Sequence, residues 1–264
     1  MREYLSNGVW SKNPCGKIKG MQYALGNLMP KVEGIAAAWK FIEEKSIEQP
    51  AKSNRIIEQL ASSRLKPETL RLFTAWGPRF KKNEARIASG DAELKTLDEI
   101  RDVFLRFGEE GFSVSFLLVP ADAHAIEING LPKSFVMDYF RYVEDAALKV
   151  LSGTADIEIR PWSSIRTEYG ESYCRLKEKI SDDLQSWVKK EEYEKAVKAA
   201  SFFSRQNAEQ SARNYCIERL IEGKIIADAF DPIKLSLVRK EKDTLNQQLP
   251  RLYIIKNRAP WMQE

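Results

Sequence analysis

The only histidine of the chain, His124, follows Asp122 by two positions and lies just beyond a short apolar run. That run, residues 114–119, ends at Pro120 and has the length and composition of a buried β-strand. In open α/β sheets, ligands bind outside the carboxyl ends of the strands. On an extended segment both side chains would point to one side, where an imidazole can act as acid, base or phosphate donor and a carboxylate can orient it or bind an ammonium group. The pair therefore predicts a functional site, with a capping Asp122 and an exposed loop histidine as the alternative.

A basic turn after an earlier β-prone run, residues 69–76, is the second candidate. It contains neither a Walker loop nor a Gly-x-Gly-x-x-Gly fingerprint, but its Gly-Pro step exposes backbone and its positive charges suit a phosphate or carboxylate group. If the run is a strand, the turn opens on the same crevice as Asp122. The groups expected to contact a substrate or a phosphate are those of Trp76, Gly77, Arg79, Lys81 and Lys82. An ordinary solvated turn is the alternative.

Three further side chains could take part in chemistry later in the chain. Ser163 follows a third β-prone run, residues 157–160, so the same strand-end rule puts it beside the crevice, where it could contact the substrate. It could be a nucleophile only beside a base, whereas helix capping is the simpler role. Tyr215 and Glu218 are one helical turn apart and share a face, so together they could bind an amino group or move a proton. A buried tyrosine beside a surface glutamate is the alternative for that pair.

Two charged clusters complete the candidates. Asp91 and Glu93 stand where a helix begins, and acidic residues there favour the helix dipole, although a catalytic carboxylate is a second interpretation. A short basic cluster near the end of the chain could contact RNA phosphates or simply form a solvated face. It consists of Arg239, Lys240 and Lys242, with Lys234 nearby.

The order of the predicted elements indicates the fold that must position these residues. Strand and helix alternate over five segments: residues 69–76, 91–107, 114–119, 135–151 and 157–160. Such alternation is typical of βαβ units and a parallel sheet. Residues 168–223 are mostly helical, and two β-prone runs at 235–238 and 252–255 could extend the sheet. We predict an α/β fold, a Rossmann-like parallel sheet flanked by helices with a helical C-terminal half. An N-terminal arm with helices (1–66) would precede one catalytic unit (67–264).

Composition narrows the class of protein. The 264 residues are 43% hydrophobic and 30% charged, enough for a sizeable core, and the net charge of +4 permits a phosphate-bearing partner without requiring one. One histidine and three cysteines without a Cys-x-x-Cys pair exclude a histidine-rich metal site and a zinc pattern, so we expect no metal and no cofactor. We see no signal peptide and no spanning apolar stretch, and predict a cytoplasmic protein with reduced cysteines and no membrane contact.

The candidate motifs resemble those of a known superfamily. Residues 114–130, with Ala-Asp-Ala-His-Ala at 121–125, resemble the segment of tyrosyl-tRNA synthetases that carries an Ala-Asp-x-His-Ala motif, and Ser163 and Glu168-Tyr169 are similar to residues that come later in those enzymes. The His-Ile-Gly-His type of ATP motif is missing. Lys-Leu-Ser at 234–236 is an incomplete form of the second ATP signature. We therefore do not expect amino-acid activation with ATP.

Cyclodipeptide synthases resemble the synthetase catalytic domain and use aminoacyl-tRNA, and their layout is similar to this one. The resemblance implies that Asp122 or Glu218 binds the ammonium group of the aminoacyl substrate and that His124 and Tyr215 transfer protons. Tyr215 and Glu218 match the family's Tyr/Glu pair with a spacing of three instead of four. The family's nucleophilic serine is replaced by Trp-Gly-Pro at 76–78. The preferred function is tRNA-dependent aminoacyl transfer that forms a peptide bond in small-molecule biosynthesis, with the basic residues meeting tRNA phosphates.

Isonitrile synthases provide the runner-up resemblance. Lys81, Asp91-x-Glu93, Lys-Leu-Ser at 234–236 and Pro-Trp at 260–261 resemble that family's pattern in the same order, while Ala-Asp-Ala at 121–123 replaces its Ser-Asp-Gly motif. This resemblance implies an enzyme that modifies a free amino acid, with Lys81 and Lys234 holding a sugar phosphate. A third possibility is a non-catalytic RNA-binding protein on a synthetase-like scaffold.

Overall fold

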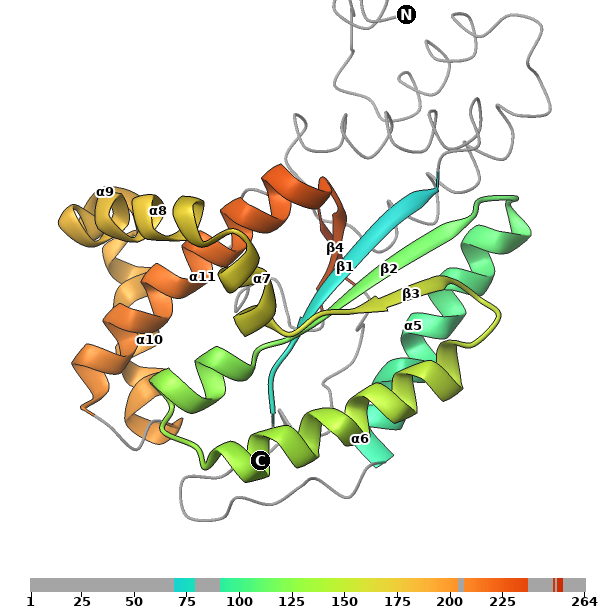
Figure 1. Cartoon of the computed structure of the whole chain (residues 1–264), viewed down its shortest axis with the longest axis horizontal. Helices are drawn as coiled ribbons and strands as arrows, with labels where there is room; N and C mark the ends of the chain where they lie inside the picture. Colours follow the sequence, from blue (N-terminus) through green and yellow to red (C-terminus); the bar gives the residue numbers. More distant parts are fainter. Residues whose placement is uncertain (1–68, 79–90, 204–206, 237–248, 250, 254–264) are drawn as a thin grey trace, which may run out of the picture.

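The computed structural model describes residues 69–78, 91–203, 207–236, 249 and 251–253 (Figure 1). The predicted N-terminal arm and helices (1–66) lie outside the described residues. The elements are β1 (Leu70–Trp76), α5 (Asp91–Glu109), β2 (Val114–Pro120), the π-helix η1 (His124–Ile128), α6 (Lys133–Leu151), β3 (Asp156–Ile159), α7 (Trp162–Glu168), α8 (Gly170–Asp182), α9 (Leu184–Trp187), α10 (Lys190–Phe203), α11 (Ala208–Phe230), β4 (Ile233–Ser236) and β5 (Arg251–Tyr253).

The strands form one five-stranded parallel sheet in the order β3-β2-β1-β4-β5. The α/β prediction with a Rossmann-like parallel sheet is therefore confirmed, and the two β-prone runs near the end of the chain are its strands β4 and β5. The chain builds outward from β1 to β3 and then returns to the other side of β1. In such sheets, ligands bind beside the point where the strand order reverses, at the carboxyl ends of the strands.

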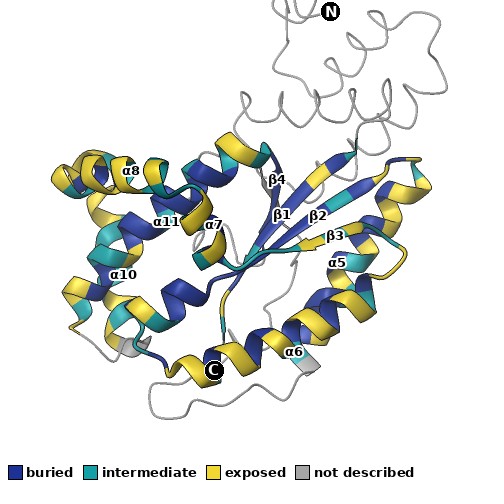
Figure 2. Cartoon of the chain, viewed as in Figure 1, coloured by how far each residue is buried: buried dark blue, intermediate teal, exposed yellow. Residues whose placement is uncertain are grey.

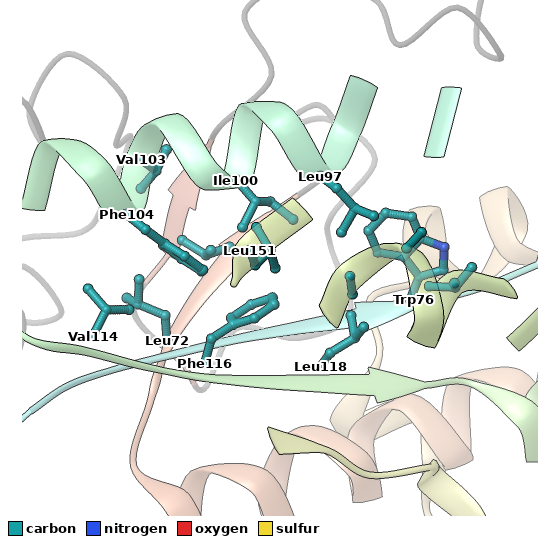
Figure 3. Close-up of a cluster of buried hydrophobic side chains, with 14 of the residues drawn as sticks. Leu72, Trp76, Leu97, Ile100, Val103, Phe104, Val114, Phe116, Leu118 and Leu151 are labelled. Carbon is teal, nitrogen blue, oxygen red and sulfur yellow. The ribbon is translucent and has the colours of Figure 1, made fainter. Parts of the chain in front are cut away.

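Helices cover both faces of the sheet (Figure 1). On one face, α5 and α6 bury apolar side chains against β1 and β2, and the rings of Phe104 and Phe116 meet edge to face at 5.0 Å (Figure 3). On the other face, α7, α8 and α11 pack over Phe73 and Leu117, with Trp162 fully buried. The central strands are consequently buried on both sides, whereas α8 and α10 are largely exposed on their outer surfaces (Figure 2).

Strand β3 closes one edge of the sheet and differs from the central strands. It has four residues, and its alternate side chains Asp156 and Glu158 are exposed. Arg160, just beyond the strand, forms an ion pair with Glu158 at 3.5 Å and another with Glu168 of α7. The edge is therefore short and charged.

The chain turns into a helix as soon as β2 ends, so the extended segment predicted for Asp122 and His124 is wrong. The Ala125 N–H donates to the Ala121 carbonyl at 3.1 Å, and the Asn129 N–H donates five residues back to the His124 carbonyl at 3.0 Å. Alanine at every second position of this segment favours helix, which the strand-end interpretation overlooked. π-Helical turns are rare and are frequent at functional sites. None of the described helices has the length and apolar character needed to cross a membrane.

Candidate active site

The candidate residues gather where η1 follows β2 and α7 follows β3, with α11 packed over η1. Asp122 and His124 belong to the first segment, Ser163 to the second, and Tyr215 and Glu218 to α11. Asp122, His124 and Glu218 are buried, Ser163 is half-buried, and Tyr215 is exposed. The structure thus brings together residues that are up to 96 positions apart in the sequence. They lie at the carboxyl ends of the strands, where parallel sheets bind ligands.

His124 forms its closest polar contact with Glu222, a residue that the sequence interpretation missed. The His124 Nε2 and Glu222 Oε2 atoms are 3.2 Å apart, and the side chains are 6% and 0% exposed. Arg219, one turn earlier on α11, donates to the same carboxylate oxygen. His124 is therefore neither on the surface nor in a loop; it is backed by a buried acid.

Burial by itself raises the pKa of Glu222. The charge of Arg219, followed by the hydrogen bond and charge of His124 and the charge of Lys234, lowers the pKa by more than burial raises it. The pKa of Glu222 is therefore about 2. The carboxylate is ionised at neutral pH. A carboxylate accepts hydrogen bonds, so His124 Nε2 carries a proton toward it. In the neutral ring, Nδ1 is then an acceptor.

Two buried atoms of this pair have no hydrogen-bond partner in the described part of the chain: His124 Nδ1 and Glu222 Oε1. Unpaired buried polar atoms are uncommon in native proteins, and each one calls for an explanation such as an ion, a water or a catalytic role. The Tyr215 ring lies edge-on to the imidazole with the centroids 5.9 Å apart. It is 38% exposed, so one aromatic neighbour of the buried pair reaches solvent.

Glu218 has different hydrogen-bond partners from Glu222, which lies one turn later on α11. Its carboxylate accepts from Trp162 Nε1 and the Tyr173 hydroxyl, both at 2.8 Å, and from Arg166 Nη1 at 3.2 Å. Burial, followed by the charge of Glu218, raises the pKa of Tyr173, which keeps that hydroxyl a donor. Three partners on α7 and α8 thus tie Glu218 of α11 to its neighbours.

Arg166 links that carboxylate to η1. It donates to both oxygens of Glu127, with Nη1 and Oε2 at 2.8 Å, and this pairing raises the pKa of Arg166 and lowers that of Glu127. Because Glu127 follows His124 by one turn, the pairing anchors the segment that carries the imidazole to α7 and α11.

Asp122 caps α7 from outside that helix. Its carboxylate accepts from the backbone N–H of Ser163 at 3.0 Å and also from the Ser163 hydroxyl. Ser163 and His124 share no hydrogen bond in the part of the chain that the structure describes. A serine nucleophile activated by this histidine is therefore not formed.

Trp76 lies on the opposite face of the sheet from His124, within the α5/α6 core. Its Nε1 donates to the Tyr139 hydroxyl at 3.0 Å, and that hydroxyl lies 3.2 Å from Glu93 Oε1 and 3.4 Å from the Gly77 carbonyl oxygen. Glu93 is completely buried, so it is not a surface residue that merely favours the helix dipole. Gly77 is exposed, and open space surrounds the position of a Cβ atom there.

Most of the residues predicted to contact phosphate lie outside the described residues, and only Lys234 of the basic residues named for that role is described. Lys234 lies on β4 and is 5% exposed, and Ser236 on the same strand is 1% exposed. The residues outside the described ranges are Arg79, Lys81, Lys82, Arg239, Lys240 and Lys242. Among the described residues, no group of three or more His, Cys, Asp or Glu side chains could hold a metal ion.

Comparisons with known proteins define the fold. No family model and no curated protein matches the chain. Among solved structures, the PvcA protein from Pseudomonas aeruginosa has a TM-score of 0.60 and 13% identity, with 84% of each chain covered. Tyrosyl-tRNA synthetase from Archaeoglobus fulgidus, complexed with L-tyrosine, has a TM-score of 0.47 and 11% identity over 78% of this chain and 54% of its own. Tryptophanyl-tRNA synthetase from Aeropyrum pernix has a TM-score of 0.45 and 12% identity over 81% and 52%.

These likenesses concern architecture. The PvcA match extends over most of both chains, and at 13% identity it establishes a shared fold and not a shared activity. The chain spans about half the length of the two synthetases, and their scores are lower. Together with the strand order, the PvcA match identifies a Rossmann-like fold.

Proposed function

We propose that the chain is an enzyme that modifies a free amino acid with a sugar phosphate, in the manner of isonitrile synthases. The observation that carries the proposal is the buried His124–Glu222 pair at the carboxyl ends of the strands, with the second ring nitrogen of His124 left open. A histidine backed by an ionised carboxylate suits general acid–base catalysis. Activity in the cytoplasm, without a membrane partner, is part of the proposal.

Two of the motifs that resemble isonitrile synthases support this choice over tRNA-dependent transfer and over RNA binding alone. Glu93, from Asp91-x-Glu93, and Lys234, from Lys-Leu-Ser, are both almost completely buried. The two motif residues thus lie inside the molecule and not on a solvated face, as a bound substrate would require. Lys234 also lies close enough to Glu222 to lower the pKa of that carboxyl.

The chemistry expected of this site is condensation of an amine with a carbonyl group. His124 takes a proton from the substrate ammonium, and the freed nitrogen lone pair attacks the carbonyl carbon of the sugar phosphate. One N–H proton of the attacking nitrogen is transferred to the carbonyl oxygen, which becomes a hydroxyl. Transfer of the remaining N–H proton lets that hydroxyl leave as water, which gives a neutral imine without oxidation or reduction. Lys234 and Lys81 would hold the phosphate group in this arrangement.

tRNA-dependent aminoacyl transfer is the second candidate, and one contact favours it. Tyr215 and His124, to which the cyclodipeptide-synthase resemblance assigns proton transfer, lie side by side with their centroids 5.9 Å apart. The aminoacyl-enzyme step lacks support, however, because Trp-Gly-Pro at 76–78 stands where that family has its nucleophilic serine. In this function aminoacyl-tRNA is the partner, Lys81, Lys82 and Arg239–Lys242 bind its phosphates, and affinity falls steeply with salt.

Mass spectrometry separates these functions. The natural chain is expressed in a bacterial host and compared with an empty vector, with His124→Ala and with Glu209→Gln. Glu209 is an exposed carboxylate on α11, the helix of Glu222, and accepts from the Tyr193 hydroxyl. An isonitrile or its breakdown product that disappears only in His124→Ala supports the proposal. A cyclic dipeptide with the same dependence replaces it by the tRNA-dependent function. A product unaffected by His124→Ala rejects both enzymatic functions at this site. Co-purifying RNA without a new metabolite indicates an RNA-binding protein.

A further inference from the structure

Two acids could orient the imidazole of His124, and the structure distinguishes between them. Asp122 lies two positions before the histidine, but its two oxygens accept from the backbone N–H and the hydroxyl of Ser163. Glu222 comes from α11, and its Oε2 atom lies 3.2 Å from His124 Nε2. Because both oxygens of Asp122 already accept from α7, Glu222 is the carboxylate that holds the ring.

The contact with Glu222 decides which nitrogen of the ring can take up a proton. A neutral imidazole has one N–H donor and one acceptor nitrogen, and an ionised carboxylate only accepts. The ring therefore carries its proton on Nε2 and its lone pair on Nδ1, which points away from Glu222. Nδ1 has no hydrogen-bond partner among the described residues. A group that gives a proton to His124 must consequently approach from the side of the ring that does not face the carboxylate.

Arg219 keeps Glu222 in the state that this arrangement needs. It lies one turn earlier on α11 and donates to the same carboxylate oxygen that faces His124. A protonated Glu222 could instead donate to Nε2, which would move the proton of the neutral ring to Nδ1 and remove its lone pair. Burial raises the pKa of Glu222, and the charge of Arg219 is the largest of the effects that lower it. The arginine thus acts against the wrong tautomer.

We infer that Glu222 is the positioning residue of His124, and that Nδ1 is the atom through which this histidine exchanges protons with a substrate. The inference rests on the proposed function for the reaction itself. In that reaction an N–H bond of the substrate ammonium breaks, an N–H bond forms at Nδ1, and the electron pair left on the substrate nitrogen becomes the nucleophile. The ring is then an imidazolium whose Nε2 proton still points at Glu222. The carboxylate stabilises that cation and acts through the imidazole.

The single histidine of the chain makes the position of the proton measurable by NMR. Protein expressed without a histidine tag and labelled with ¹⁵N-histidine has one imidazole spin system, whose two nitrogen shifts show which nitrogen carries a proton. At neutral pH we expect one tautomer, with the proton on Nε2 and the lone pair on Nδ1. A proton on Nδ1, or the averaged shifts of two exchanging tautomers, overturns the inference. The natural protein suffices for this measurement, so it decides even if a variant at Glu222 does not fold.

A double-mutant cycle tests whether Glu222 acts through His124. The variants are His124→Gln, Glu222→Gln and the two combined, and mass spectrometry gives the product formed per folded molecule. Glutamine at 222 keeps an oxygen for Nε2 but has no negative charge to stabilise an imidazolium. Glu222→Gln should lower product formation about 10–100-fold when His124 is present.

The same substitution should lower product formation less than about twofold in the His124→Gln background, because the group through which Glu222 acts is then missing. No loss when His124 is present, or an equal loss in both backgrounds, overturns the inference, since a carboxylate that only supports the fold acts independently of the imidazole. Glu209→Gln, on the same helix, is the matched control and should change product formation in neither background.

The two measurements separate this inference from the proposed function. Product formation by a protein whose Nδ1 carries the proton contradicts the inference and leaves the proposed function standing. A proton on Nε2 without any product contradicts the proposed function and leaves Glu222 as the residue that fixes the tautomer of His124.

Discussion

Among the described residues, each face of the sheet has a completely buried glutamate, and the two have different neighbours. On the α5/α6 face, the Tyr139 hydroxyl lies between Glu93 and Trp76 Nε1, and all three side chains lie in or beside the hydrophobic core. On the α11 face, Glu222 backs the only imidazole, whose second nitrogen has no partner in the described structure. Burial of a charge therefore occurs on both faces and does not by itself separate them. A side chain that can exchange a proton next to the buried charge, here the imidazole of His124, is the more informative difference.

The largest expected effect is on catalysis at the α11 face. Replacing His124 by Gln should lower the rate of product formation roughly 10²–10⁴-fold, because general acid–base catalysis contributes about that much. The melting temperature should change little, since the variant can still donate to Glu222. Rates measured by mass spectrometry on folded protein test this, with Glu209→Gln as the control. A rate within threefold of the natural protein would place the chemistry elsewhere.

The α5/α6 face should respond to substitution in stability and not in activity. Phe116→Ala removes a completely buried ring that contacts Phe104, and such changes cost about 3–5 kcal/mol of unfolding free energy. Urea unfolding gives the free energy, and the rate per folded molecule should stay close to that of the natural protein. A loss below about 1 kcal/mol would contradict the tight packing of Phe116 in the hydrophobic cluster on this face.

Acid should act on the α11 face through Glu222. Its pKa is lowered from the ordinary value of 4.5 to about 2, so between these values the unfolded chain binds a proton that the folded protein does not. The contribution to stability is complete above pH 4.5 and is lost as the pH falls toward 2, with a total of about 3 kcal/mol. Urea unfolding over this pH range should show a shallower decline for Glu222→Gln. Equal slopes would mean that the carboxylate is not held ionised.

The smallest expected effect concerns the polar contacts of the α5/α6 face. Tyr139→Phe removes the hydroxyl that accepts from Trp76 Nε1 in a buried setting, at a cost of about 1–2 kcal/mol. Tyr193→Phe removes an exposed hydroxyl bonded to Glu209 and should cost less than about 0.5 kcal/mol. Calorimetry on both variants gives the difference. A fall in the catalytic rate of Tyr139→Phe as large as that of His124→Gln would show that the two faces do not act separately.

The fold could be predicted because its signals are local. Runs bounded by Gly and Pro predicted β1, β2 and β3, and the three-and-four spacing of apolar residues predicted α5. The β-prone runs at 235–238 and 252–255 indicated β4 and β5, although β4 begins two residues earlier, at Ile233. The helical turn at His124 was missed because a strand-end rule says where a segment lies and nothing about its conformation. Glu222 could have been found, since it follows Tyr215 by seven positions and Glu218 by four, a spacing that puts all three on one helix face.

Other contacts of the site could not be predicted from one sequence. The pairing of Asp122 with Ser163 joins residues 41 positions apart, and that of His124 with Glu222 joins residues 98 apart. Such contacts depend on how α7 and α11 pack on the sheet, which no periodicity encodes. The position of Trp76 was missed for the same reason: it ends a strand beside the predicted crevice, but its side chain packs on the opposite face of the sheet from His124.

The short, charged edge strand β3 has a consequence for how copies of the chain meet. A sheet edge presents unpaired backbone groups that can recruit a strand from another molecule. At β3 such a strand would have to pair beside the exposed carboxylates of Asp156 and Glu158, and a second copy aligned there would bring the same negative charges against them. Strand β3 therefore resists edge-to-edge aggregation of a sheet whose central strands are almost wholly apolar.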